Sequence, residues 1–328
     1  MVAITGANGL LGSFILKKLL DEKMDVIGIK RKESDIQLLD GYQDKITWRE
    51  ADILDAHSLE ESLKGIHVVI HAAASVSFNP RHSKKIYTVN VEGTKNIVNA
   101  CLKIGIPRLI HISSVAALGR QKGITHLNEQ SKWIDSSLNS DYAESKYLAE
   151  LEVFRGQEEG LSTVVINPSI IMAPADWAKS SAKIFKYVWD SKPFYTTGSL
   201  NYVDVRDVAD MAYSLCPSKI EGERIIANAG TITYQFLFEE IAKRFNKKAP
   251  RIGIGANVVA IASWFEEMRS RITQSEPMFT RQSSRMACET FQYENQKAME
   301  ILGFKFRTLQ DTLDWCCAYY MVNVSTNK

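Results

Sequence analysis

The chain of 328 residues lacks the features that mark membrane, secreted and nucleic-acid-binding proteins. No apolar run approaches the roughly 20 residues that a membrane-spanning helix needs. Lys and Arg number 40 against 38 Asp and Glu, so there is no basic excess of the kind that binds nucleic acid. The first residues lead directly into a glycine turn, without the charged leader of a signal peptide. We therefore expect a cytoplasmic protein that binds neither nucleic acid nor membrane.

Cysteine is scarce as well. The five cysteines are odd in number and none forms a CxxC pair, which argues against a disulfide framework and against a zinc site. We expect reduced thiols and no bound metal. The cysteines are Cys101, Cys216, Cys288, Cys316 and Cys317.

Short apolar runs alternate with helical patterns through the first half of the chain. This alternation predicts an α/β fold, in which right-handed crossovers build a doubly wound parallel sheet of the Rossmann type. The expected strands are 2–5, 26–29, 46–48, 68–71, 109–112 and 164–166, and the periodicity of residues 89–104 predicts one continuous helix.

The pattern loosens after Asn167, and the rest of the chain is mostly helical. We predict a Rossmann domain over residues 1–170 and a smaller substrate-binding lobe over 171–199 and 229–328, with 200–228 returning to the first domain. The apolar helix 258–272 is interpreted as a core-facing helix or a lid rather than a membrane-surface helix. Aromatic residues of the lobe would suit an apolar substrate, although they are more often plain core: Trp177, Tyr187, Trp189, Phe194, Tyr195 and Trp264.

A glycine-rich turn joins the first strand to the first helix. Gly6, Gly9 and Gly12 would allow a tight turn, a close approach of the backbone to a pyrophosphate, and packing of the helix on the sheet. The start of the helix would present free N–H groups to the phosphates. A glycine triplet is weak evidence alone, but its place at a strand-to-helix junction indicates a dinucleotide site.

The residues after the second strand bear on which dinucleotide binds. An NAD site usually has an acidic residue there for the ribose hydroxyls, whereas this chain has Lys30 and Arg31. Cations attract a 2′-phosphate, so we predict NADP as the preferred cofactor and NAD as the alternative, with Arg31 the better candidate for the phosphate. A solvated basic loop is the simpler interpretation. Asp52 could accept a hydrogen bond from the adenine amino group, or could merely cap a turn.

Tyr142 and Lys146 lie one turn apart on a predicted helix with Ser140 or Asp141 as its N-cap. A nearby ammonium would lower the pKa of the phenol and allow Tyr142 to exchange a proton with a carbonyl oxygen. Such pairs are also common on exposed helices. Ser114, at the end of the fifth strand, could hold that oxygen, and Asn90 could hold a water or a backbone group near the lysine; the simpler roles are a turn cap and a buried structural amide.

These motifs together resemble the extended short-chain dehydrogenase/reductase family, also called the NAD-dependent epimerase/dehydratase family. The resemblance rests on the glycine turn, His71 to Ala74, Asn90, Ser113–Ser114, the Tyr142–Lys146 pair and Asn167 to Ser169. It implies that Ser114 and Tyr142 are catalytic and that Lys146 tunes the tyrosine and binds the nicotinamide ribose. It also implies a set of cofactor contacts: Gly6, Asn8, Gly9, Leu10, Leu11, Gly12, Lys30, Arg31, Asp52, Ile53, Ala72, Ala73, Ala74, Tyr142, Lys146, Pro168 and Ile170.

The chain departs from the sugar-nucleotide branches of that family. Ser114 is followed by Val115 rather than by the Thr-Asp-Glu set of dehydratases, and residues 166–174 lack the Arg-Pro and Tyr-Gly-Pro pattern typical of epimerases. They are more similar to the dihydroflavonol reductase and hydroxysteroid dehydrogenase branch. We expect reversible reduction of a ketone or aldehyde to an alcohol. A sugar-nucleotide epimerase and a non-catalytic nicotinamide sensor are the alternatives. Family members often form dimers, so a homodimer is also an expectation.

Overall fold

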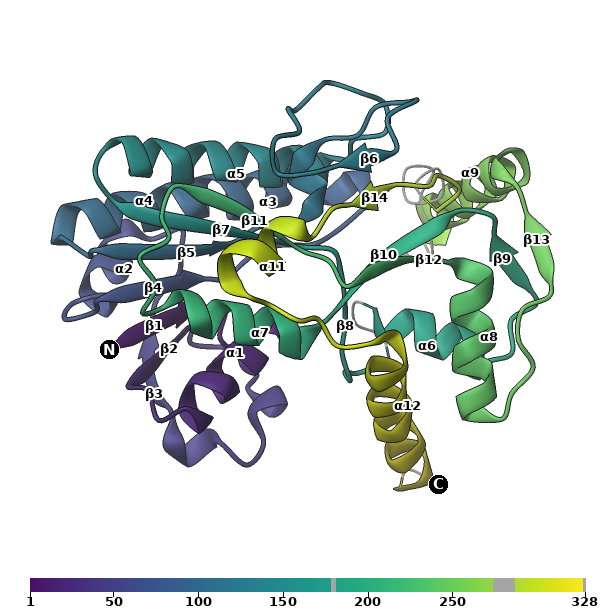
Figure 1. The fold of residues 1–328 in the computed structure, drawn as a ribbon, viewed down its shortest axis with the longest axis horizontal. Helices are drawn as coiled ribbons and strands as arrows, with labels where there is room; N and C mark the ends of the chain where they lie inside the picture. The colour runs from purple at the N-terminus through teal and green to yellow at the C-terminus, as the bar shows by residue number, and fades with distance from the viewer. Residues whose placement is uncertain (178–180, 274–286, 327–328) are drawn as a thin grey trace.

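The apolar runs of the first half form one seven-stranded sheet in the computed structural model, which describes residues 1–177, 181–273 and 287–326 (Figure 1). The strand order is β3-β2-β1-β4-β5-β7-β11, and every neighbouring pair is parallel. The strands are β1 Val2–Thr5, β2 Val26–Lys30, β3 Thr47–Glu50, β4 Val68–His71, β5 Arg108–Ile112, β7 Ser162–Pro168 and β11 Glu223–Ala227. The predicted Rossmann fold is confirmed.

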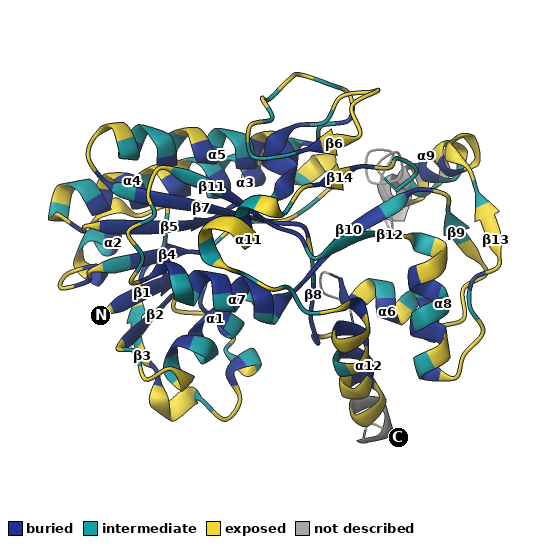
Figure 2. Cartoon of the chain, in the orientation of Figure 1, coloured by how far each residue is buried: buried dark blue, intermediate teal, exposed yellow. Residues whose placement is uncertain are grey.

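Helices cover both faces of this sheet, which explains why its central strands are apolar throughout. Ile4 packs with α1 and α7 on one face, whereas the adjacent Ala3 packs with α2, α4 and α5 on the other. Figure 2 shows that the central strands are mostly buried, whereas the edge strand β3 is partly exposed. The bounds of these helices are α1 Leu10–Asp21, α2 Ala56–Ser62, α4 Gly93–Ile104, α5 Asp141–Glu158 and α7 Val205–Leu215.

The predicted helix 89–104 is confirmed, but its first turn is π-helical. A short helix α3, Ser83–Tyr87, leads into a π-helical turn over Thr88–Glu92, and α4 begins at Gly93. The apolar spacing of 89–104 does not distinguish a π turn from an α turn, and the π turn contains Asn90, whose side chain bonds to Ser75 and Ser145 in distant segments. Single π turns within helices frequently occur at functional sites.

The second lobe is built around a three-stranded sheet in the order β12-β10-β8 and an apolar cluster between α6, α8 and α12. Two further pairs of short parallel strands, β9 with β13 and β6 with β14, complete the strands of the described chain. The bounds are β6 His126–Leu127, β8 Ile170–Met172, α6 Ala182–Trp189, β9 Phe194–Thr196, β10 Ser199–Asp204, β12 Gly230–Thr233, α8 Tyr234–Phe245, β13 Ile252–Ile254, α9 Ala256–Thr273, β14 Gln292–Tyr293, α11 Gln296–Leu302 and α12 Leu309–Thr326.

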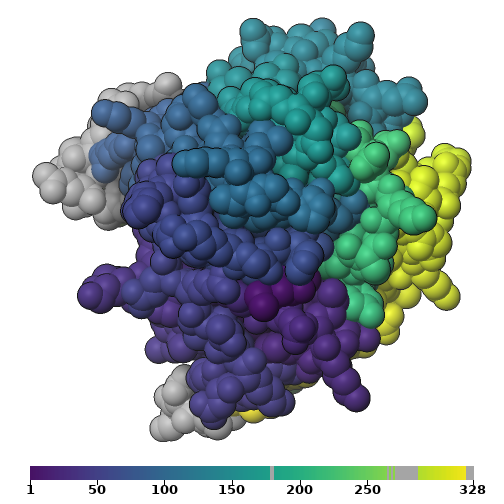
Figure 3. All heavy atoms as spheres, turned by 90° about the vertical axis from the view of Figure 1, so that its left-hand side faces the viewer, coloured from purple at the N-terminus to yellow at the C-terminus, as the bar shows by residue number. Residues whose placement is uncertain are grey.

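The chain passes between the two parts more often than the predicted boundaries allow. Within the predicted return segment 200–228, α7 and β11 join the Rossmann part, but β10 belongs to the lobe sheet. Within the predicted lobe segment 229–328, α11 packs on the Rossmann core through Ala298. Figure 3 shows this C-terminal segment beside the green α7–β11 region. A sheet edge at β11 needs cover, and α11 supplies it.

The lobe aromatics form a core rather than a substrate surface. Trp177 stacks on Tyr320 with ring centroids 4.1 Å apart, and Trp189 meets Phe245 edge-on at 5.1 Å. Tyr187 and Tyr195 pack against the same cluster, whereas Phe194 is exposed. The side chain of Trp264 lies outside the described residues. The structure thus favours the structural interpretation of the described aromatics over the proposed substrate contacts.

Helix α9 does not turn all its described apolar side chains inward. Val259 is buried, but Val258 and Ile261 are exposed. Its Phe265 and Met268 side chains lie outside the described residues. Within the described parts of the chain, no helix is both long enough and apolar enough to cross a membrane.

Candidate active site

The glycine turn has the geometry of a phosphate cradle. Gly6 has φ +68°, and a Cβ there would lie 2.7 Å from the Cα of Ala73. A Cβ on Gly12 would lie 2.1 Å from the carbonyl oxygen of Gly6, so a side chain at position 12 would separate helix α1 from the turn. Helix α1 follows Gly9 with no capping side chain and no acidic residue in its first turn. Its N–H groups are therefore available to an anion, and the residues fit a dinucleotide pyrophosphate.

Small residues after β4 allow the glycine turn to approach the neighbouring strand. The backbone N–H of Ala72 donates to the Thr5 carbonyl oxygen at 3.2 Å, and that of Ala73 donates to the Thr5 hydroxyl at 3.4 Å. These bonds continue the β1–β4 pairing up to the turn. The backbone of Ala72 and Ala73 therefore lies against Gly6, whereas contact of Ala72, Ala73 and Ala74 with the cofactor stays a prediction.

The loop after β2 lies next to the same turn. Asn8 donates from Nδ2 to the carbonyl oxygen of Asp35 at 3.0 Å, which holds the loop that carries Arg31 beside the glycines. Arg31 is exposed, whereas Lys30 Nζ lies 3.9 Å from Glu50 and 5.9 Å from the ring centre of Trp48. Of the two predicted phosphate ligands, the structure therefore leaves Arg31 facing solvent and directs Lys30 toward β3.

Asp52 has the simpler of its two predicted roles in this structure. Its Oδ1 accepts a hydrogen bond from the backbone N–H of Leu54 at 2.9 Å, which stabilises the turn after β3. The next residue, Ile53, packs so closely on Gly93 that a Cβ there would lie 2.6 Å from Ile53 Cδ1. This contact fixes the start of α4 against the loop after β3.

Helix α5 carries the predicted proton-transfer pair. Ser140 caps it by accepting a hydrogen bond from the backbone N–H of Ala143 at 2.9 Å, so Ser140 and not Asp141 is the N-cap. Lys146 is only 2% exposed and donates from Nζ to the carbonyl oxygen of Ile112 at 2.9 Å. Burial lowers the pKa of Lys146 to about 8, against which the charge of Glu150 acts. The ammonium thus lies at the carboxyl end of β5.

Tyr142 lies beside Ser114 at the same strand end. The hydroxyl of Ser114 hydrogen-bonds to Tyr142, while Ser114 also accepts from the backbone N–H of Ala116 at 3.2 Å. Burial raises the pKa of Tyr142, and the Ser114 bond and the charge of Arg120 oppose that rise. The predicted lowering by Lys146 is not found, because its ammonium is directed to Ile112.

Asn90 binds backbone groups rather than the lysine. Its Oδ1 accepts from the N–H of Ser75 at 2.7 Å, and its Nδ2 donates to the Ser75 carbonyl at 3.0 Å and to the Ser145 hydroxyl at 3.0 Å. Ser145 in turn donates to the carbonyl oxygen of Tyr142 at 2.8 Å. Asn90 therefore holds the loop after β4 and the first turn of α5 in one arrangement, and is a positioning residue.

A directed hydrogen-bond chain links this π turn to the glycine turn. Thr94 donates from its hydroxyl to the Asn90 carbonyl at 2.6 Å, so it accepts from His71 Nε2, 3.0 Å away. His71 Nδ1 must then accept from the hydroxyl of Thr5, at 2.7 Å. Burial lowers the pKa of His71 to about 3, so the ring is neutral and has a single tautomer.

Several functional candidates carried no sequence signal. Phe78 meets Tyr142 edge-on at 5.9 Å, and the charge of Arg120, in the segment after β5, acts on the pKa of the same tyrosine. Pro168 is buried at the end of β7 and Ile170 is exposed at the start of β8, both near the carboxyl edge of the sheet. Within the described residues, no group of three or more His, Cys, Asp or Glu side chains could hold a metal ion.

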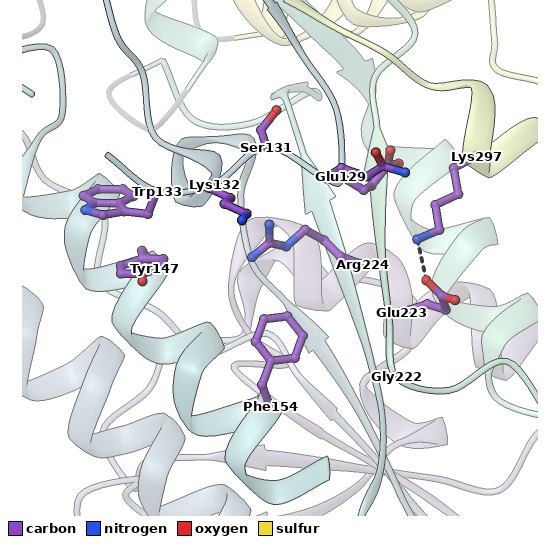
Figure 4. Close-up of a pocket in the computed structure, with 11 residues that line it drawn as sticks. Glu129, Ser131, Lys132, Trp133, Tyr147, Phe154, Gly222, Glu223, Arg224 and Lys297 are labelled. Atoms are coloured by element: carbon purple, nitrogen blue, oxygen red, sulfur yellow. Dashed lines mark hydrogen bonds and ion pairs between the residues drawn. The ribbon is translucent and has the colours of Figure 1, made fainter. Parts of the chain in front are cut away.

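A surface pocket of about 570 Å³ lies beside this site rather than in it (Figure 4). It is lined from α5 by Tyr147 and Phe154 and from β11 by Glu223 and Arg224. Neither Tyr142 nor any other candidate catalytic or cofactor residue contributes to it. Because ligands of open α/β sheets bind beyond the carboxyl ends of the strands, the strand ends and not this pocket locate the candidate chemistry.

Comparison with known proteins agrees with this geometry. Residues 2–229 match the model of the NAD dependent epimerase/dehydratase family. A putative dihydroflavonol 4-reductase of Synechocystis sp. is 26% identical over 94% of this chain and 91% of its own length. Cinnamoyl-CoA reductase 1 of Oryza sativa subsp. japonica is 29% identical over 76% of each chain.

Solved structures show the same fold. The crystal structure of gox2253 has a TM-score of 0.83 at 27% identity, covering 98% of both chains. A UDP-glucose 4-epimerase of Thermotoga maritima has a TM-score of 0.80 at 19% identity, covering 98% of this chain and 99% of its own, which is evidence for the fold alone. The chain belongs to the NAD-dependent epimerase/dehydratase family of extended short-chain dehydrogenases/reductases.

Proposed function

We propose that this protein is an NAD(P)-dependent oxidoreductase that reversibly reduces a ketone or aldehyde to an alcohol. The observation that carries the proposal is the hydrogen-bonded Ser114–Tyr142 pair at the carboxyl end of β5, with the buried ammonium of Lys146 one helical turn away. The similarity to reductases supports this reaction over others of the family.

In the proposed reaction, Ser114 donates a hydrogen bond to the substrate carbonyl oxygen and Tyr142 delivers a proton to it. A bound nicotinamide would supply the hydride to the carbonyl carbon, or accept it in the oxidation direction. Lys146 would bind the nicotinamide ribose, and the nearby charge of Arg120 favours the phenolate that Tyr142 becomes. After transfer, Tyr142 must be reprotonated before the next turnover.

Replacement of the phenol tests this assignment. Tyr142→Phe should lower kcat by about 10²–10⁴-fold, the usual contribution of general acid catalysis, while the Kd for the cofactor stays nearly unchanged. Tyr147→Phe is the matched control, because Tyr147 is on the same helix but stacks on Trp133 at the surface pocket. Turnover of Tyr142→Phe at the level of Tyr147→Phe would remove Tyr142 from the mechanism.

We further propose NADP as the preferred cofactor, with Arg31 binding the 2′-phosphate. Arg31→Ala should weaken the binding of NADPH by about tenfold or more and that of NADH much less, as measured by fluorescence titration. Lys30→Ala is the control, because Lys30 is directed toward Glu50. An equal loss of affinity for NADPH and NADH in Arg31→Ala would contradict the 2′-phosphate assignment.

The epimerase alternative differs in how the cofactor is used. An epimerase oxidises and then reduces the same substrate, so the purified protein would retain NAD and would catalyse no net oxidation or reduction. Net loss of NADPH absorbance in a screen of carbonyl compounds supports the reductase. Retained NAD together with interconversion of sugar nucleotides would refute it.

A further inference from the structure

Glu150 is a fully buried carboxylate that the proposed reaction does not use. It lies on α5, four residues after Lys146, and is 0% exposed. Its Oε1 accepts a hydrogen bond from Asn167 Nδ2 at 2.6 Å, and its Oε2 lies 2.6 Å from Nη2 of Arg224. Buried ion pairs contribute little net stability, because desolvation offsets the attraction. Their presence beside a reaction site therefore calls for a functional explanation.

This cluster contacts both elements of the proposed site. Asn167 also donates from Nδ2 to the carbonyl oxygen of Ser114 at 2.9 Å, so the amide joins the carboxylate to the backbone of the serine. The negative charge of Glu150 acts on Lys146 and raises its pKa against the effect of burial. One side chain thus affects the position of Ser114 and the charge of Lys146.

We propose that Glu150, paired with Arg224 and bonded to Asn167, is a positioning unit for the catalytic groups. It places a fixed negative charge behind the ammonium of Lys146 and tethers the backbone of Ser114 at the end of β5. The proposal rests on the proposed function, since it assigns a purpose to the Ser114–Tyr142–Lys146 arrangement.

Among the described residues, Glu150 is the group whose negative charge acts on Lys146. His71 on β4 and His111 on β5 are the other ionisable groups that interact with it, and burial keeps the pKa of each imidazole low and the ring neutral. Tyr142, on the same helix, is uncharged because burial raises its pKa. A neutral cavity would favour loss of the Lys146 proton, and Glu150 opposes that loss.

Arg224 is the cationic partner of this buried carboxylate. It enters from β11 with its side chain 14% exposed, and Figure 4 shows its guanidinium reaching into the surface pocket, toward Lys132. Its guanidinium also lies 5.5 Å from the ring centre of Phe154. Arg224 therefore balances the charge of the carboxylate while its own side chain stays partly exposed.

The charge can be removed with little change of shape. Glu150→Gln keeps the oxygen that accepts from Asn167 but no longer attracts the ammonium. NMR of protein carrying ¹³C-labelled lysine, with Lys146 assigned from the spectrum of Lys146→Met, should show its titration midpoint moved by about one pH unit toward acid. Glu152→Gln is the matched control, because Glu152 lies on the same helix and pairs with Arg155 at the surface. An unchanged midpoint in folded Glu150→Gln would overturn the proposal.

A second variant protects the test against loss of folding. Glu150→Gln leaves Arg224 without its counter-ion, whereas Glu150→Gln combined with Arg224→Met removes both charges and should show the same shift. The NMR readout requires no turnover. A shifted Lys146 in a protein that reduces no carbonyl compound would refute the proposed function alone, whereas an unshifted Lys146 in an active reductase would refute the positioning unit alone.

The tether to Ser114 is tested separately. Asn167→Ala removes the amide that holds the Ser114 carbonyl, so the serine hydroxyl should be misplaced and kcat should fall about tenfold or more. The Kd for NADPH should stay within about twofold, since the glycine turn is untouched. A kcat equal to that of the unsubstituted protein would overturn the tether.

Discussion

The buried ammonium of Lys146 predicts an unusual dependence of stability on pH. A lysine in the unfolded chain has a pKa of 10.5, and burial lowers it to about 8 in the folded protein. Between these two values the unfolded chain binds a proton that the folded protein does not, so stability rises with pH in this window. The ionisation of Lys146 therefore lowers the free energy of unfolding by about 3 kcal/mol at pH 7 and by about 1 kcal/mol at pH 9.5.

The assay compares urea unfolding of the cofactor-free protein with that of Lys146→Met at both pH values. The substitution removes the charge, so the advantage of Lys146→Met over the unsubstituted protein should shrink by about 2 kcal/mol from pH 7 to pH 9.5. The buried cysteines and tyrosines also have raised pKa values, but they contribute equally to the stability of both proteins. Their contribution therefore cancels in the comparison. His71 and His111 are neutral throughout the window. A difference that does not change with pH would refute the reasoning, since Lys146 would then titrate as an exposed lysine does.

Two further substitutions test the frame of the cofactor site. Gly12→Ala places a Cβ against the carbonyl oxygen of Gly6, so it should lower the free energy of unfolding by about 1–3 kcal/mol and abolish NADPH binding in a titration, whereas Gly255→Ala, which meets no atom within 4 Å, should do neither. Thr94→Val leaves the Nε2–H of His71 without an acceptor and should cost about 1–3 kcal/mol in urea unfolding.

Each of these two predictions has a result that contradicts it. Gly12→Ala with unchanged cofactor affinity would show that the helix start can move away from the glycine turn without loss of the cradle. Thr94→Val with unchanged stability would show that the histidine does not depend on this acceptor.

The central sheet and the glycine turn could be predicted because their signals are local. An apolar run such as Val68 to Ile70 is covered on both faces of the sheet, and Gly12 is required by its contact with Gly6 within a single strand–turn–helix unit. The same holds for the start of α5, where Ser140 precedes the helix by one residue. Patterns within about a dozen residues are sufficient for such elements.

The rest of the site depends on partners that are distant in the chain. Glu150 and Arg224 meet through the β7–β11 edge of the sheet, and neither residue shows a pattern in its own segment. Arg120, whose charge acts on the pKa of Tyr142, lies in a loop without periodic sequence. The expected lowering of the Tyr142 pKa by Lys146 was a local inference from helical spacing. That inference failed because the Lys146 ammonium donates its hydrogen bond to the carbonyl oxygen of Ile112, on another element.

The π turn at Asn90 connects the two halves of the proposed chemistry. From Ala73 beside Gly6, hydrogen bonds run through Thr5, His71 and Thr94 to the Asn90 carbonyl, and each member donates to the next. The Asn90 side chain continues the chain through Ser145 to the carbonyl of Tyr142. Because these bonds join the glycine turn to the first turn of α5, we expect the proposed cofactor turn and the proposed proton donor to be positioned together, before either ligand binds.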